Sequence, residues 1–229
     1  MFEQLDHPRN VTEFAAVCRR NHLHLDQIKL QLLQRYSVML AEWNARVNLV
    51  SRRDVENIWS AHLLHSVSLL FVMDLPVSAH VMDLGSGGGL PGIPLAILRP
   101  DLQIVLVDSI AKKTHAMSSM VAELGLGNVQ VVCSRVEDLG QPHAAKYGVV
   151  IARAVAPLED LLRWSAKVFD RGVSGGAMLV TYKGGDLEQE LARAKKRGKG
   201  EEIRVVPLIF PGSAEAGMEE KKLVVVRIQ

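Results

Sequence analysis

The sequence contains little cysteine and no long apolar run, and each absence excludes a class of protein. Cys18 and Cys133 are the only cysteines among 229 residues, and no C-x-x-C spacing occurs. Neither a zinc site nor a disulfide framework is therefore expected. No apolar stretch approaches the ~20 residues that a membrane span needs. The polar start, MFEQLDHPRN, is unlike a secretory signal. We expect a cytoplasmic protein that binds no metal and no membrane.

An excess of charge is also lacking. Lys and Arg number 27 and Asp and Glu number 25, which gives a formal net charge of +2. This value is too small to indicate a nucleic-acid partner, so any basic surface must be local. The local candidates are the run ARAKKRGKG at 192–200 and the pairs Arg52-Arg53 and Lys112-Lys113. Each fits phosphate contacts and a solvated surface equally well.

Residues 1–76 are predicted to form a helical lobe. Apolar residues recur there at steps of three and four, which predicts an amphipathic helix. The positions are Ile28, Leu32, Tyr36, Leu40, Trp43 and Val47. A second helix is predicted over 56–72, with Asp54 as its N-cap. Trp43 and Trp59 lie on apolar faces and are expected in the core.

Short β-branched runs begin beyond residue 76. They cover 81–84, 103–108, 129–133, 148–152, 177–183, 203–210 and 222–228. Helix-like stretches separate the first five, at 93–99, 111–124, 136–140 and 157–169. Alternating strands and helices predict a parallel sheet built from βαβ units. The last two runs lack a helix between them and predict an antiparallel hairpin. Residues 77–229 are thus expected to form an α/β, Rossmann-like domain with a mostly parallel seven-stranded sheet.

The first of these strands leads into the glycine-rich segment VMDLGSGGGLPGIP at 81–94. A P-loop would need a Lys after its glycines, and this segment has none. A dinucleotide site would need different glycine spacing and a helix in place of the prolines. Asp83 precedes the loop, and its carboxylate would repel a pyrophosphate but attract an ammonium. These features favour S-adenosyl-L-methionine, with Gly85, Gly87 and Gly89 at the cofactor.

Two more acids follow the next two strands. Asp108 ends the second strand, where a carboxylate can accept the ribose hydroxyls while Ile110 packs on the adenine. Glu137 follows the third strand, at the expected adenine edge. Acids at the carboxyl ends of successive parallel strands share one crevice. The alternative is that the loop is only a tight turn and that Asp108 only caps a helix.

Known nucleophile motifs are missing after the fourth strand. The segment 152–157 reads ARAVAP, without the Cys of a cytosine C5 methyltransferase or the Asn/Asp-Pro-Pro-aromatic motif of many exocyclic amine methyltransferases. Cys133 is expected in the core instead. What remains is a substrate atom with a free lone pair, such as guanine N7. Small-molecule substrates also pass this elimination.

The motifs together resemble the bacterial small-subunit ribosomal RNA guanine-N7 methyltransferases, also called glucose-inhibited division protein B. They are Asn48-Leu49, HLLHS at 62–66, the loop at 83–94, LVDS at 106–109, SRVE at 134–137, IARA at 151–154 and Lys183-Gly184. The resemblance implies a class I S-adenosylmethionine-dependent methyltransferase that acts on 16S ribosomal RNA or the small ribosomal subunit. Two positions depart from the family pattern: Val50 replaces a Thr, and His65 replaces an Asp.

The resemblance also implies roles for individual residues. Cofactor contacts are implied for Gly85, Leu90, Val136, Glu137 and Arg153. A polar and cationic RNA-binding mouth is implied for Asn48, His62, Arg135, Arg153 and Lys183. Arg153 would position the substrate, and no general base is expected. Two alternatives stay open at this point: Arg153 could brace the site through Glu137 or Asp83, and His62 could be structural. A small-molecule methyltransferase and a non-catalytic ribosome or nucleotide binder remain the rival functions.

Overall fold

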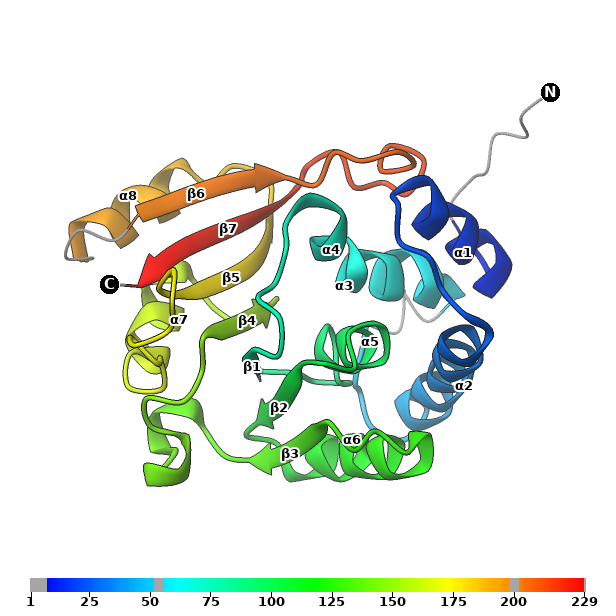
Figure 1. The fold of residues 1–229 in the computed structure, drawn as a ribbon, viewed down its shortest axis with the longest axis horizontal. Coiled ribbons are helices and arrows are strands. Elements are labelled where there is room, and N and C mark those ends of the chain that lie inside the picture. The colour runs from blue at the N-terminus through cyan, green and yellow to red at the C-terminus, as the bar shows by residue number, and fades with distance from the viewer. Residues whose placement is uncertain (1–7, 52–55, 198–201, 229) are drawn as a thin grey trace.

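One mixed β-sheet with helices on both faces forms the molecule (Figure 1). The computed structural model describes residues 8–51, 56–197 and 202–228. Its strands are β1 (His80–Leu84), β2 (Gln103–Asp108), β3 (Val129–Cys133), β4 (Val149–Arg153), β5 (Ala177–Gly184), β6 (Glu202–Pro207) and β7 (Lys221–Ile228). Its helices are α1 (Val11–Arg20), α2 (Gln27–Asn44), η2 (Ile58–Leu64), α3 (His65–Val67), α4 (Leu69–Val72), α5 (Gly92–Leu98), α6 (Ala111–Leu124), η3 (Val136–Asp138), η4 (Gln141–His143), α7 (Leu158–Ser165) and α8 (Glu188–Arg197).

The strand order is β3-β2-β1-β4-β5-β7-β6. The five strands from β3 to β5 run parallel, whereas β7 is antiparallel to both β5 and β6. The predicted seven-stranded, mostly parallel sheet with an antiparallel end is therefore confirmed. The sequence did not reveal that the last strand inserts between β5 and β6.

Central strands are apolar at successive positions because helices cover both faces of the sheet. Val81 and Ile104 belong to one buried cluster, and Met82 and Val105 belong to the other. In Figure 1, α1 to α6 lie on one side of the sheet, and α7 and α8 lie on the other. Residue 76 stays a predicted domain boundary. The apolar cluster on the α1–α6 side draws side chains from both parts of the chain.

The predicted N-terminal helices exist, with corrections. Tyr36 and Leu40 of α2 are fully buried, but Ile28 is 69% exposed and does not belong to the packed face. The predicted helix over 56–72 is interrupted, since η2 is a π-helix and α3 and α4 are short. The expected N-cap Asp54 and the pair Arg52-Arg53 lie outside the described residues.

One further expectation is wrong, and one helix was not predicted. Cys133 is exposed and not in the core, because β3 is an edge strand. Helix α8 covers much of the basic run at 192–200, a segment for which the sequence predicted no helix; residues 198–201 lie outside the described part. Asp186 accepts a hydrogen bond from the backbone N–H of Glu188, at 2.9 Å. This short acidic side chain before the helix was a capping signal in the sequence.

Candidate cofactor and substrate groove

The carboxyl ends of β1 and β4 define the candidate site. These strands are neighbours, but the chain continues from β1 toward β2 and from β4 toward β5. Such a switch point leaves a crevice beyond the strand ends, where ligands of open α/β sheets bind. Two hollows open there, of about 360 and 390 Å³. Both are lined by Gly85, Lys113 and Ala154, so they are two parts of one groove.

The glycine loop forms the floor between the hollows. Gly85, Gly87 and Gly89 have positive φ angles of 70°, 58° and 88°. A Cβ on Gly85 would lie 2.6 Å from Val155 Cγ2, and one on Gly92 would lie 2.2 Å from Leu106 Cδ2. Part of the glycine requirement therefore comes from the protein's own packing, in addition to any close approach of a ligand.

Asp83 is fully buried beneath this loop. Its Oδ2 accepts the backbone N–H of Gly92 at 2.8 Å, and its Oδ1 is buried without a hydrogen-bond partner among the described residues. Burial raises the pKa of this carboxyl to about 7, although Gly92 and the charge of Arg153 act in the opposite direction. Asp83 is not among the residues that line either hollow. Its carboxylate supports the loop from below.

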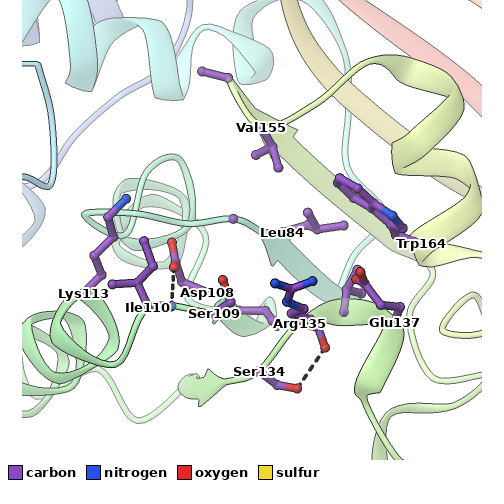
Figure 2. A pocket seen from close by; sticks show the side chains of 14 residues that line it. Leu84, Asp108, Ser109, Ile110, Lys113, Ser134, Arg135, Glu137, Val155 and Trp164 are labelled. Carbon is purple, nitrogen blue, oxygen red and sulfur yellow. Dashed lines mark hydrogen bonds between the residues drawn. The ribbon is translucent and has the colours of Figure 1, made fainter.

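Asp108 lies at the wall of the first hollow (Figure 2). Its Oδ2 accepts the Gly87 backbone N–H at 3.0 Å, and its Oδ1 accepts that of Ile110 at 2.9 Å. Asp108 thus links the glycine loop to the turn before α6, which a helix cap alone would not do. Lys113 lies on the same side in Figure 2, whereas Lys112 is exposed.

The opposite wall of the first hollow comes from the segment that follows β3, including η3, and from α7. Val136 is buried, Arg135 and Glu137 are exposed, and all three line the hollow. The Glu137 carbonyl accepts the Lys167 ammonium. Figure 2 places Trp164 beside Glu137 and across from Ile110. Sequence reasoning missed Trp164, although its place on the helix after ARAVAP could have indicated it.

The second hollow joins the sheet to the N-terminal helices. Its lining includes Leu90, Arg153, His62 and His65. The Arg153 guanidinium donates to the His62 carbonyl at 3.5 Å and lies 3.4 Å from His62 Nδ1. The direct contacts of Arg153 are thus with His62, where the sequence suggested Asp83 or Glu137. Burial and the charges of Arg153 and Lys221 lower the pKa of His65 to about 3.

Long-range hydrogen bonds hold the N-terminal helices against the groove. The Tyr36 hydroxyl donates to the Gly88 carbonyl at 2.8 Å, and the Tyr182 hydroxyl donates to the Ser66 carbonyl at 2.5 Å. Asn44 Oδ1 accepts the backbone N–H groups of Leu49 and Val50 at 2.8 and 2.9 Å. Asn44 therefore shapes the rim of the second hollow, a role that sequence reasoning did not find.

Three predicted RNA contacts are absent from the lining of the second hollow: Arg135 lines the first hollow, and Asn48 and Lys183 line neither. Asn48 is exposed, next to Leu49 and Val50 of the rim but outside the lining itself. Lys183 Nζ lies 2.6 Å from Glu190 Oε1 of α8 and donates to the Ala156 carbonyl at 2.8 Å. The charge of Lys183 is thus already balanced by a carboxylate from the helix that the sequence did not predict.

Several proteins of known name are similar to this chain in sequence. A family model described as "GidB: rRNA small subunit methyltransferase G" matches residues 29–214. This chain belongs to that family. A ribosomal RNA small subunit methyltransferase G from Chlorobaculum tepidum is 38% identical over 217 residues, or 93% of this chain and 95% of the relative. One from Roseiflexus sp. is 38% identical over 213 residues, or 89% and 85%.

Solved structures confirm the fold class. A predicted O-methyltransferase from Agrobacterium tumefaciens aligns with a TM-score of 0.53 at 17% identity, over 72% of this chain and 80% of its own. P. horikoshii TYW2, solved in complex with MeSAdo, gives 0.52 at 11% over 72% and 61%. The [4+2]-cyclase SpnF reaches 0.55 at 16% over 72% and 79%, so the fold alone does not define the reaction. The family membership confirms the expected S-adenosyl-L-methionine-dependent methyltransferase.

No helix in the described ranges is long and apolar enough to cross a membrane. These ranges contain no group of three or more His, Cys, Asp or Glu side chains placed to hold a metal ion.

Proposed function

We propose that this protein transfers a methyl group from S-adenosyl-L-methionine to N7 of a guanine in 16S ribosomal RNA. The observation that carries the proposal is the pair of connected hollows at the switch point. One is walled by Asp108 and Val136, and the other by Arg153 and His62. A donor and an acceptor can therefore lie side by side at Gly85 and Ala154, which line both hollows.

The first hollow suits the cofactor. Asp108 presents carboxylate oxygens for ribose hydroxyls, while Ile110 and Trp164 offer apolar surfaces for an adenine. Gly85, Val136 and Glu137 of this hollow would hold the remainder, and Leu90 would contact the cofactor from the adjoining second hollow. Gly87, Gly89 and the buried Asp83 would keep the loop in shape. When bound, S-adenosyl-L-methionine supplies an electrophilic methyl group, which guanine N7 accepts through its lone pair without losing a proton.

The second hollow would position the base. No general base is required, so the contribution of these residues is orientation. Arg153 presents a planar guanidinium to the hollow, and its contacts with His62 hold it there. Asn48 and Arg135, both exposed beside the groove, and Lys183 would contact the flanking RNA.

Methyl incorporation tests the proposal. Tritiated S-adenosyl-L-methionine is supplied with 16S ribosomal RNA as naked RNA, as an assembly intermediate and as mature small subunits, all from cells lacking this methylation. We expect label in at least one substrate. Absence of label from all three, with salt-sensitive RNA binding retained, would favour a non-catalytic binder. Cofactor binding without RNA binding or labelling would favour a small-molecule methyltransferase.

A further inference from the structure

A third hollow, of about 410 Å³, adjoins the substrate side of the groove. It lies over the carboxyl ends of β4 and β5 and the start of β7. Its described lining is His65, Arg153, Ala154, Val155, Ala156, Tyr182, Lys183, Gly184 and Lys221. Four of these residues, His65, Arg153, Ala154 and Lys221, also line the second hollow. A ligand that fills the second hollow can therefore continue into the third.

The third hollow is cationic. Arg153, Lys183 and Lys221 contribute positive charges, and no acidic side chain is among the described residues that line it. Glu190 balances Lys183, and it does so from outside the lining. Arg153 is half-buried, and Lys221 is exposed. The positive charges of Arg153 and Lys221 help keep the His65 imidazole neutral, so His65 adds no positive charge to the hollow.

Lys221 stands out among these side chains. It begins β7 and pairs with Gly184 in the sheet, where a Cβ on Gly184 would lie 3.7 Å from Lys221 Nζ. This places the ammonium at the end of β5, next to Gly184. Lys221 also lies beyond residues 29–214, the part of the chain matched by the family model.

We propose that the third hollow binds a backbone phosphate of the RNA next to the target guanine, with Lys221 as a direct contact. The inference rests on the proposed function, because the base would occupy the adjoining second hollow. A phosphodiester is the anion that covalently accompanies a nucleotide base. Lys and Arg side chains are the usual partners of backbone phosphates, and such contacts position the nucleic acid without reading its sequence.

The test compares Lys221→Gln with Lys222→Gln. Lys222 is the adjacent residue of equal charge, but its ammonium donates to the Gly185 carbonyl at 2.7 Å and it is not part of the lining. Binding of a 16S RNA fragment is measured between about 50 and 300 mM salt in the presence of S-adenosylhomocysteine. For Lys221→Gln we expect about fivefold weaker RNA binding and a log–log salt slope reduced by about 1. Lys222→Gln should keep wild-type values.

Calorimetry of S-adenosylhomocysteine binding shows whether each variant is folded, and both should match the wild type. An unchanged RNA affinity and salt slope in Lys221→Gln, while the wild type methylates RNA, would overturn this inference alone. An equal loss in Lys222→Gln would also overturn it, because the effect would then be one of general charge. If the wild type methylates no RNA, the proposed function fails, and this inference fails with it.

Discussion

The two sides of the groove are built in different ways. The cofactor side consists of three strand ends close in sequence, and Asp108 joins the first two through the backbone N–H groups of Gly87 and Ile110. The substrate side depends on contacts across 91 positions between Arg153 and His62 and across 116 between Tyr182 and Ser66. Local motifs can specify the first side, whereas only the folded chain assembles the second. Changes on each side should therefore affect different ligands.

Replacement of Arg153 by Lys should have the largest effect. Lys keeps the charge near Asp83 but loses the planar donor array that contacts His62. We expect kcat/KM for RNA to fall about 100-fold, equivalent to about 2.7 kcal/mol. Because Arg153 lines the second hollow but not the first, cofactor affinity measured by calorimetry should fall far less. Equal losses of cofactor and RNA affinity would contradict the assignment of different ligands to the two sides of the groove.

The converse change is Asp108→Asn. An amide cannot accept hydrogen bonds from both backbone N–H groups and from the ribose hydroxyls, because an NH2 group, which is a donor, replaces one carboxylate oxygen. Cofactor affinity should fall about 30-fold, or about 2 kcal/mol, while RNA binding by the cofactor-free protein stays unchanged. Asp138→Asn, at an exposed residue of η3 outside the lining, is the matched control. Unchanged cofactor affinity in Asp108→Asn would contradict the ribose assignment.

Asp83 predicts a pH dependence of stability. Its pKa is raised from 3.8 to about 7 by burial, so the folded state binds the extra proton between these values. The contribution of Asp83 is full below about pH 4 and is lost as the pH rises through about 7. In urea unfolding, Asp83→Asn should therefore gain stability relative to the wild type from pH 5 to 8, by on the order of 2 kcal/mol. A constant difference across this range would contradict the buried, raised carboxyl.

Trp164→Ala removes an apolar wall of the first hollow. We expect about tenfold weaker cofactor binding, or about 1.4 kcal/mol, with little change in RNA affinity. Cofactor binding should also change tryptophan fluorescence. That signal should persist in Trp43→Phe, whose indole packs near α6 against His115, and vanish in Trp164→Phe. A fluorescence change on cofactor binding that persists in Trp164→Phe would contradict the placement of the adenine against Trp164.

Tyr36→Phe tests the join between the two sides. It leaves the Gly88 carbonyl without its donor and should lower the free energy of unfolding by about 1 kcal/mol. Because Gly88 belongs to the cofactor loop, cofactor affinity should fall a few-fold as well. Tyr147→Phe also removes a buried hydroxyl, one that lies 2.6 Å from His143 Nδ1 outside the groove lining. The control should lose stability and keep cofactor affinity.

The same contrast explains what the sequence could predict. The glycine loop, Asp108 and the parallel sheet follow from short motifs and strand periodicity, so they were predictable. The π-helical turn that presents His62 has no local signature, and the pairing of Lys183 with Glu190 depends on α8. The apolar face of that helix is narrow: Ala194 is buried, as is Leu187 just before the helix. Its sequence, EQELARAKKR, is therefore typical of a charged surface segment. Contacts between distant segments cannot be inferred from spacing.

The central claim is that guanine N7 receives the methyl group, and a single-atom change in the substrate tests it most directly. A 16S RNA fragment that the protein methylates is made again with 7-deazaguanosine, in which a C–H replaces N7. We predict that this RNA binds with nearly unchanged affinity and takes up no methyl label from S-adenosyl-L-methionine. Undiminished incorporation into the 7-deaza RNA would contradict the account, because another atom would then be the acceptor.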